Sequence, residues 1–413
     1  MANVFGRGSL GAPYWRLWIS SGLSNLADGI VKVAMPLVAV HYTRSPMLIA
    51  GLAVALALPW LLFALPVGAL ADRIDRRRMM VGANSIRVAL PAALMLAVVL
   101  DLGSIWMLYA VAFGLGIAET VYDTSAQSIL PQLVDRAQLS RANSRLFAAE
   151  LTANQFAGPP LAGFLVAAGV AVAFAAPAAL WAVALGALLL VHGSFRVEAS
   201  RHTSLRADIA EGVRFLWRHR LLRALAVMTG VFNLASNATF SVFVLFAVGS
   251  ASAMGLSEPA FGVLFATTAV GSLLGSLVAE RIELALGRAR TLLLSVLSGV
   301  LLVGVPAVTT NPFLIGAGLF AGGVGIMLWN VVVVALRQRI TPDRLLGRVN
   351  SGYRLLAWGT IPLGAVVGGV LAELLGLRWV FATMALLMLA LLGGMTILTD
   401  DAIDAAEHDA GHR

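Results

Sequence analysis

The chain of 413 residues is 59% hydrophobic and only 12% charged, with a formal net charge of +8. A soluble domain carries about 25% charged residues, so most of this chain must have lipid rather than water as its solvent. The sequence contains no cysteine, which excludes disulfides and thiolate metal sites. Composition therefore excludes a soluble globular domain and predicts an integral membrane protein in contact with the lipid bilayer.

Twelve apolar stretches reach the length of about 20 residues that a helix needs to cross a bilayer. None of them shows the alternation of a strand, so the predicted fold class is all-α. The stretches lie near residues 15–40, 47–71, 79–100, 104–130, 144–168, 171–192, 223–248, 259–280, 290–309, 312–336, 348–373 and 377–398.

Short motifs of the first half recur in the second half, separated by 206 to 208 residues. Chance would not place five matches in one register. Duplicated membrane halves flank a central path, so we predict twelve transmembrane helices in two pseudo-symmetric six-helix bundles around a central cavity. The pairs are Asn25-Leu26-Ala27 with Asn233-Leu234-Ala235, Ala71-Asp72-Arg73-Ile74 with Ala279-Glu280-Arg281-Ile282, Tyr122-Asp123 with Trp329-Asn330, Arg141-Ala142-Asn143-Ser144 with Arg348-Val349-Asn350-Ser351, and Gly158 and Gly163 with Gly364 and Gly369.

Basic residues predict the topology. Of the 29 lysines and arginines, Arg44 and Arg378 lie outside, Lys32 and Arg87 fall within spans, and the others gather on the side of the N-terminus. The positive-inside rule makes that side cytoplasmic, so we expect a multi-pass protein of the plasma membrane with both termini inside. The same asymmetry explains the basic net charge without a nucleic-acid partner.

Four regions are expected: an N-terminal bundle (1–192), a linker (193–222), a C-terminal bundle (223–399) and an acidic tail (400–413). The linker has apolar residues at helical spacing, which predicts an amphipathic helix on the inner membrane surface; a simple tether between the bundles is the alternative. The tail from Asp400 is expected to be disordered. The apolar linker positions are Leu205, Ile209, Val213, Leu216 and Trp217.

Ionisable residues inside spans are unfavourable and mark functional sites by default. Asp28 and Lys32 lie one turn apart in the first span, as do Glu119 and Asp123 in the fourth. Their second-half counterparts are neutral, so proton or cation chemistry is expected in the first half. The alternative is a static network pairing Asp28 with Lys32, and Arg87 with Glu119, Asp123 or Glu150. The proton and substrate candidates are Asp28, Lys32, Asn25, Glu119, Asp123, Asn233, Asn237 and Asn330.

The loop after the second span carries Gly68-Ala69-Leu70-Ala71-Asp72-Arg73-Ile74-Asp75-Arg76-Arg77. It resembles the loop between helices 2 and 3 of the major facilitator superfamily, G-x-L-A-D-R-x-G-R-[KR], with Asp75 in place of the second glycine. The resemblance covers the whole chain. It implies a transporter without cofactor or metal, and a gating motif that latches the two halves. The residues matched to that motif's charged and first glycine positions are Gly68, Asp72, Arg73, Arg76 and Arg77.

A second stretch, Gly158-Pro159-Pro160-Leu161-Ala162-Gly163, is similar to the G-P-x-x-G-G signature of antiporters in that superfamily, with Ala162 in place of one glycine. Gly158, Pro159 and Gly163 therefore favour export, although a purely structural helix bend explains them equally well. The basic residue that such antiporters carry in the fourth span is absent here.

The segment Leu346-Gly347-Arg348-Val349-Asn350, followed by Pro362-Leu363-Gly364, resembles a branch that contains macrolide-efflux proteins and enterobactin exporters. The leading hypothesis is a proton-coupled, monomeric secondary transporter that exports small amphipathic molecules of drug, antibiotic or siderophore type. An importer or lipid transporter is the alternative within this fold. A membrane-embedded transferase is disfavoured because the loops lack D-x-x-D and D-x-D pairs, and no P-loop supports ATP drive; we therefore expect no enzyme.

Overall fold

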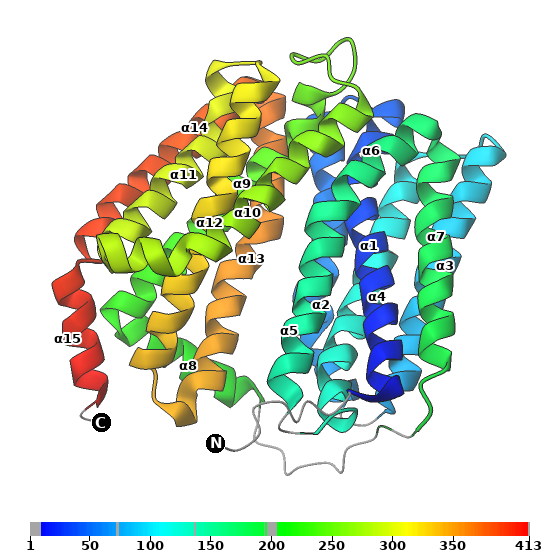
Figure 1. Ribbon diagram of the computed structural model, residues 1–413. Helices are drawn as coiled ribbons and strands as arrows, with labels where there is room; N and C mark the ends of the chain where they lie inside the picture. Colours follow the sequence, from blue (N-terminus) through cyan, green and yellow to red (C-terminus); the bar gives the residue numbers. More distant parts are fainter. Residues whose placement is uncertain (1–9, 72–73, 136–137, 194, 196–204, 412–413) are drawn as a thin grey trace. The chain divides into compact units, whose positions relative to one another are not determined.

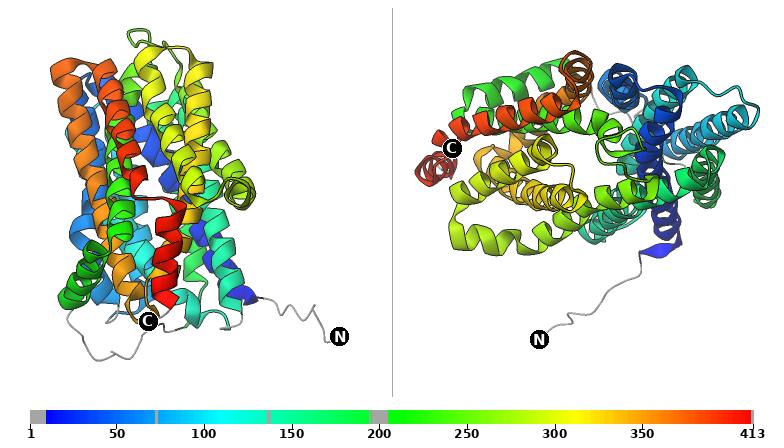
Figure 2. Two further views of the ribbon diagram at one scale, coloured as in Figure 1. Left: turned by 90° about the vertical axis from the view of Figure 1, so that its left-hand side faces the viewer. Right: turned by 90° about the horizontal axis from the view of Figure 1, so that it is seen from above.

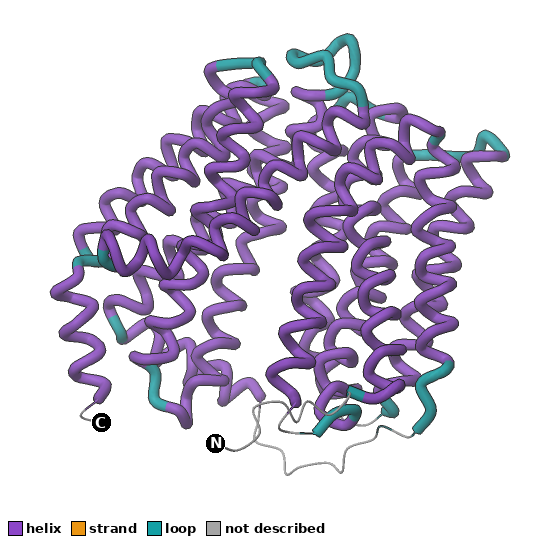
Figure 3. The backbone as a smooth tube through the Cα atoms, viewed as in Figure 1, coloured by secondary structure: helices purple, strands orange, loops and turns teal. Residues whose placement is uncertain are grey.

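The computed structural model describes residues 10–71, 74–135, 138–193, 195 and 205–411. Within these ranges the chain is helical and forms no β-strand (Figure 3). Val248 and Leu256 make one isolated bridge in the turn that precedes a long helix. The predicted all-α fold class is confirmed.

Helices of the first half follow the predicted spans closely (Figure 1). Their bounds are α1 Gly11–Tyr42, α2 Pro46–Ala71, α3 Arg76–Val99, α4 Ile105–Ile129, the 3₁₀ turn η1 Leu130–Gln132, α5 Leu139–Glu150, the π-helix η3 Leu151–Ala157, α6 Gly158–Ala168 and α7 Val170–Leu189.

Helices of the second half begin with the linker helix. Their bounds are α8 Leu205–Arg218, α9 Arg220–Ala247, α10 Glu258–Leu286, α11 Arg288–Val308, α12 Pro312–Ile340, α13 Asp343–Leu375, α14 Leu377–Ala390, the 3₁₀ turn η4 Leu391–Thr396 and α15 Asp400–Gly411.

Eleven helices of the described chain are long and apolar enough to cross a membrane. The remaining predicted span, 144–168, is the continuous run of α5, η3 and α6, which a π-helix divides. Pro159 and Pro160 have no amide hydrogen, so the carbonyls one turn earlier lose their donors. The amide of Gly158 donates to the Ala153 carbonyl instead, which is the wider spacing of a π-helix.

The chain forms two compact units. The first contains residues 1–38 and 58–200, and the second contains 39–57 and 201–413. The C-terminal end of α1 and the first half of α2 thus group with the second unit.

A glycine contact joins α1 to α6 in the first unit. A Cβ atom on Gly158 would lie 2.6 Å from the backbone carbon of Gly29, and one on Gly29 would lie 2.4 Å from the Asn154 oxygen. The second unit repeats this contact between α13 and α9, where a Cβ on Gly364 would lie 2.3 Å from the Leu234 oxygen. Duplication has therefore kept the same backbone approach in each half.

The linker helix α8 packs on the start of α13. A Cβ on Gly212 would meet the Arg348 carbonyl at 2.1 Å, and the side chain of Arg348 forms an ion pair with Glu211. Leu216 is fully buried whereas Trp217 remains half exposed. One face of the predicted amphipathic helix is thus occupied by protein.

The acidic tail is ordered as helix α15, so the expectation of disorder was wrong. Asp400 and Asp401 occupy the first turn of α15, where acidic side chains stabilise a helix. Asp400 Oδ1 accepts from the amide of Ala289 at 3.0 Å and so caps α11, whose own N-cap residue, Gly287, has no side chain. Ile403 is fully buried, on a helix that contacts α12 and α9 (Figure 2).

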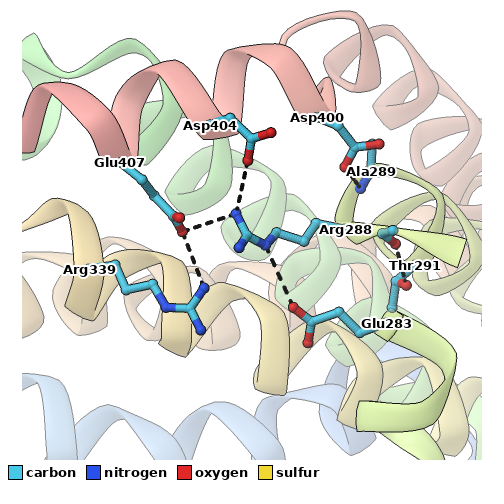
Figure 4. A network of polar contacts seen from close by, with 9 residues as sticks. Glu283, Arg288, Ala289, Thr291, Arg339, Asp400, Asp404 and Glu407 are labelled. Atoms are coloured by element: carbon cyan, nitrogen blue, oxygen red, sulfur yellow. Dashed lines mark hydrogen bonds and ion pairs between the residues drawn. The ribbon is translucent and has the colours of Figure 1, made fainter. Parts of the chain in front are cut away.

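Arginines on α11 and α12 hold α15 by charge (Figure 4). Arg288 lies 3.3 Å from Asp404 and 3.1 Å from Glu407, and 3.7 Å from Glu283 at the end of α10. Arg339 lies 3.4 Å from the same Glu407 oxygen. The tail finds its counter-ions on helices more than sixty residues away in sequence, which its own composition could not reveal.

We expect Arg288→Ala to loosen α15, because this one cation pairs with acids from two helices. Amide hydrogen exchange of residues 400–411 should accelerate by about fivefold, the equivalent of roughly 1 kcal/mol for a small surface network. Arg290→Ala is the matched control. Arg290 lies two residues after Arg288 in α11, is exposed, and has no ion pair among the described residues. Equal exchange in the two variants would contradict this role of Arg288.

Candidate functional site

Charged side chains of α1 and α4 meet at membrane depth in the first unit. Lys32 Nζ lies 3.2 Å from Glu119 Oε1 and donates a hydrogen bond to it. The lysine side chain is 41% exposed and the glutamate side chain 26%. A charge exposed at this depth is strongly unfavourable against lipid, so this face of α1 and α4 requires water or polar groups opposite it.

Asp28 has a different partner. Its Oδ1 lies 3.4 Å from an Arg87 nitrogen of α3, and the arginine side chain is 0% exposed against 10% for the aspartate. The alternative pairing of Asp28 with Lys32, and of Arg87 with the α4 acids, is therefore wrong. A spacing of one turn placed Asp28 and Lys32 near each other, but the packing of α3 and α4 gives each a closer opposite charge.

Aromatic rings surround the Arg87 guanidinium. Its carbon lies 5.1 Å from the centre of the Tyr122 ring and 5.7 Å from that of Trp181 on α7. Both rings are buried. Cations within about 6 Å of a ring face are attracted to it, so the rings stabilise a charge that the membrane interior otherwise disfavours.

Asp123, one turn after Glu119, is exposed and forms no ion pair within the described residues. Its carboxylate is therefore available to a cation from outside the bundle. Glu150, at the end of α5 beside the π-helix, is also exposed. Four acids and two bases thus give this part of the first unit an excess of negative charge.

The asparagine candidates do not form one site. Asn25 donates to the Ser21 carbonyl at 2.9 Å and accepts from Asn154 at 3.5 Å, which links α1 to η3. Asn233 donates to the Ala357 carbonyl of α13 at 2.7 Å. Asn25 and Asn233 are repeat partners with the same role between helices. Asn237 donates to the Asn233 carbonyl, and Asn330 is exposed on α12.

The motif for which the sequence predicts a gating role lies at the junction of α2 and α3. Gly68 is in α2, Arg76 and Arg77 begin α3, and Asp72 and Arg73 lie outside the described residues. Arg77 donates to the Leu189 carbonyl at 2.8 Å, where a cation favourably meets the end of α7.

Asp75, which replaces a glycine of the motif, acts as a cap. Its Oδ1 accepts from the Arg78 amide at 3.1 Å at the start of α3, and its Oδ2 accepts from the Phe195 amide at 2.7 Å. The substitution thus fixes this loop to the segment that follows α7.

The antiporter-like motif is part of the packing core of the first unit. Gly158, Pro159 and Gly163 are buried in α6. Gly158 provides the backbone approach to Gly29 described above, and Pro159 begins α6 after the π-helix. The structural role that the sequence left open is therefore present.

The described residues contain no group of three or more His, Asp or Glu side chains arranged to hold a metal ion. Within the described residues the site instead consists of two ion pairs and two exposed carboxylates that have none, Asp123 and Glu150. Carboxylates of this kind can exchange protons or bind cationic groups.

The sequence matches the family of transmembrane secretion effectors over residues 12–411. The chain belongs to this family of the major facilitator superfamily. The match spans nearly the entire chain, so it includes both units and α15.

Several relatives in the major facilitator superfamily are named as efflux pumps. The chain is 27% identical to the multidrug efflux pump Tap of Mycolicibacterium fortuitum, over 88% of this chain and 90% of that protein. It is 26% identical to the pump of the same name in Mycobacterium tuberculosis, over 92% of each chain. The protein is thus a multi-pass membrane transporter with a small-molecule substrate.

Solved transporters share the fold. A mutant of the nucleoside transporter NupG superposes with a TM-score of 0.74 at 13% identity, covering 94% of this chain and all of that one. A bacterial homologue of the iron transporter ferroportin gives 0.73 at 14% identity, covering 94% and 99%. At these identities the likeness establishes the twelve-helix fold.

A pair of aromatic contacts in this transporter was not predicted. Tyr122 of α4 and Ser20 of α1 bring their hydroxyls to 3.2 Å. In the second unit Trp329 of α12 donates to Thr229 of α9 at 2.9 Å. In the sequence repeat Tyr122 corresponds to Trp329. The residues that supply the hydroxyl groups, Ser20 and Thr229, do not correspond to each other but lie one position apart in the repeat. Only the packed helices reveal that the two contacts correspond.

Proposed function

We propose that this secondary transporter exports small amphipathic molecules in exchange for protons. The observation that carries the proposal is the group of titratable side chains at membrane depth in the first unit. Asp28 lies against Arg87, Lys32 lies against Glu119, and Asp123 has no ion pair within the described part of the chain. The pumps named for multidrug efflux among its relatives support export as the direction.

The proposed exchange uses two kinds of carboxylate. Asp28 is held by Arg87 when charged, and protonation removes that attraction. Asp123 is exposed and accepts the positive group of a cationic substrate, while Lys32 and Glu119 neutralise each other beside it. Because a proton and a cation both neutralise these acids, the binding of one opposes the binding of the other, which is the coupling that an antiporter needs.

Transport in inverted membrane vesicles tests this function. Vesicles containing the protein should accumulate a cationic amphipathic dye from a substrate panel when their interior is acidic, and an ionophore that collapses the pH gradient should abolish the accumulation. Vesicles without the protein are the control. Accumulation that is unaffected by the ionophore would contradict proton coupling, and dye movement in the opposite direction would favour the importer.

The topology gives a further prediction. We infer from the distribution of basic residues that residues 193–222 lie in the cytoplasm. Since the chain has no cysteine, Leu205→Cys can be labelled without background. An impermeant thiol reagent should label it only after the cells are opened.

Leu102→Cys is the control for the opposite side, because the exposed Leu102 lies in the loop between α3 and α4. It should react with the same reagent in intact cells. Labelling of position 205 from outside intact cells would refute the proposed orientation.

A further inference from the structure

The interior of the first unit contains polar atoms without protein partners. Asn84 lies on α3 one turn before Arg87 and is 0% exposed. Its side-chain oxygen and nitrogen have no hydrogen-bond partner in the described part of the chain. A buried amide is among the groups that folded proteins almost always satisfy.

Two further buried side chains of the first unit, Arg87 and Trp181, also lack hydrogen-bond partners within the described residues. None of the Arg87 side-chain nitrogens has a hydrogen bond within the described residues, and neither does the indole nitrogen of Trp181. The separation of 3.4 Å between Arg87 and Asp28 is well beyond the 2.7–2.9 Å of a charge-assisted hydrogen bond. Arg87 thus has an opposite charge nearby but no acceptor for its donors.

Arg87 contacts Trp181, and helical spacing puts Asn84 on the same face of α3 as Arg87. Long side chains on a helix lean toward its N-terminus, so Arg87 extends in the direction of Asn84. The guanidinium carbon is 5.7 Å from the Trp181 ring, and α3 and α7 are packed against each other. We therefore infer that the unsatisfied hydrogen-bonding groups lie on the side of α3 that faces α7, and most of them are donors.

We propose that buried water molecules bind between α3 and α7, on Asn84, Arg87 and Trp181, and keep Arg87 in place when Asp28 is protonated. The oxygen of water accepts hydrogen bonds from the arginine and the indole, and its hydrogens are donated to Asn84 Oδ1. Buried water with two to four polar partners is a regular part of protein interiors. The effect on proton exchange rests on the proposed function, whereas the water site itself does not.

The electrostatic reason lies in the permanence of the arginine charge. A guanidinium is not deprotonated in proteins, so protonation of Asp28 leaves a buried cation without its counter-ion. Tyr122 and Trp181 offer ring faces to that cation, and water with the Asn84 amide supplies the missing acceptors. Asn84 is thus a positioning residue that allows Asp28 to be neutral while the bundle remains folded.

A double-mutant cycle of thermal unfolding tests the water site. Asp28→Asn removes the counter-ion of Arg87, and Asn84→Leu removes the amide that anchors the water. If the water anchored by Asn84 stabilises Arg87 when the Asp28 carboxylate is absent, the two substitutions will not be additive. The Tm of the double variant should then fall by about 2 °C or more beyond the sum of the two single losses. Combining Asn84→Asp with Asp28→Asn supplies a new carboxylate near Arg87. This second double variant should have a higher Tm than Asp28→Asn alone.

Ser85→Ala serves as the matched control in the same cycle, because Ser85 is exposed and its hydroxyl bonds to Val81 of its own helix. Additive Tm losses for Asp28→Asn with Asn84→Leu would overturn the proposal. The Tm is also measured with chloride replaced by gluconate. A Tm that changes with this replacement in the wild type but not in Asn84→Leu would overturn the proposal as well, because the bound ligand would then be an anion rather than water.

The pH profile of transport separates this inference from the proposed function. Without the water, protonation of Asp28 leaves Arg87 less well solvated, so Asn84→Leu should move the midpoint of gradient-driven efflux about one pH unit toward acid. Ser85→Ala should leave it in place. If the cycle is non-additive but Asp28→Asn transports normally, the water site stands and Asp28 as the coupling residue fails. An unmoved midpoint in Asn84→Leu, with Asp28→Asn inactive, would overturn the role of the water in coupling.

Discussion

Asp28→Asn should abolish efflux driven by a proton gradient while the protein remains folded. Asparagine mimics the protonated carboxyl group, so the variant cannot alternate between a charged partner of Arg87 and a neutral one. Dye accumulation in inverted vesicles should fall to the background of vesicles that lack the protein. Binding of the dye measured without a gradient should persist, because the exposed Asp123 is unchanged.

Two acids of α4 provide the comparison for Asp28→Asn. Glu119→Gln breaks the ion pair with Lys32, and Asp123→Asn removes the exposed carboxylate; each should reduce efflux less than Asp28→Asn and leave it pH-dependent. If Asp28→Asn keeps full pH-dependent transport and Asp123→Asn loses it, the coupling residue lies on α4.

Gly158→Ala should destabilise the first unit strongly. The added Cβ would lie 2.6 Å from the Gly29 carbonyl carbon and 2.7 Å from its Cα, and neither backbone atom can move without displacing α1. Overpacking of this kind costs about 1–3 kcal/mol or more. Gly364→Ala should show the corresponding loss in the second unit, where the Cβ would meet the Leu234 oxygen. Thermal unfolding and the yield of monodisperse protein measure the effect.

Gly186→Ala and Gly22→Ala are the controls for this pair. A Cβ on either glycine has no atom within 4 Å, and alanine is favoured over glycine in a helix by about 1 kcal/mol. These two variants should therefore match or slightly exceed the wild type in Tm. A loss in the controls equal to that of Gly158→Ala would mean that helix-wide effects, rather than the α1–α6 contact, decide the result.

Local sequence patterns predicted the membrane helices well. Hydropathy, Gly, Pro and charge placed α9 at 223–248 and α12 at 312–336, against observed bounds of Arg220–Ala247 and Pro312–Ile340. Such features depend on the residues of one segment and on the thickness of the bilayer. The repeat of Gly158 as Gly364 was likewise visible in sequence, and the structure gives its physical content as one backbone contact in each unit.

The candidate site was predicted in its members but not in its pairing. The sequence identified Asp28, Lys32, Arg87 and Glu119 because charges inside spans stand out. It could not assign partners, since an ion pair between helices depends on how α1, α3 and α4 rotate and pack, and spacing along one helix favoured the wrong pair.

Sequence alone determined that this chain is an all-α membrane protein built from two related halves, because hydropathy and repetition are properties of the linear chain. Tertiary structure alone decided that Arg87 belongs to Asp28, that Trp181 lies beside it, and that α15 is ordered against Arg288 and Arg339. Each of these depends on opposite charges or an aromatic ring from distant segments, which become neighbours only when the helices pack.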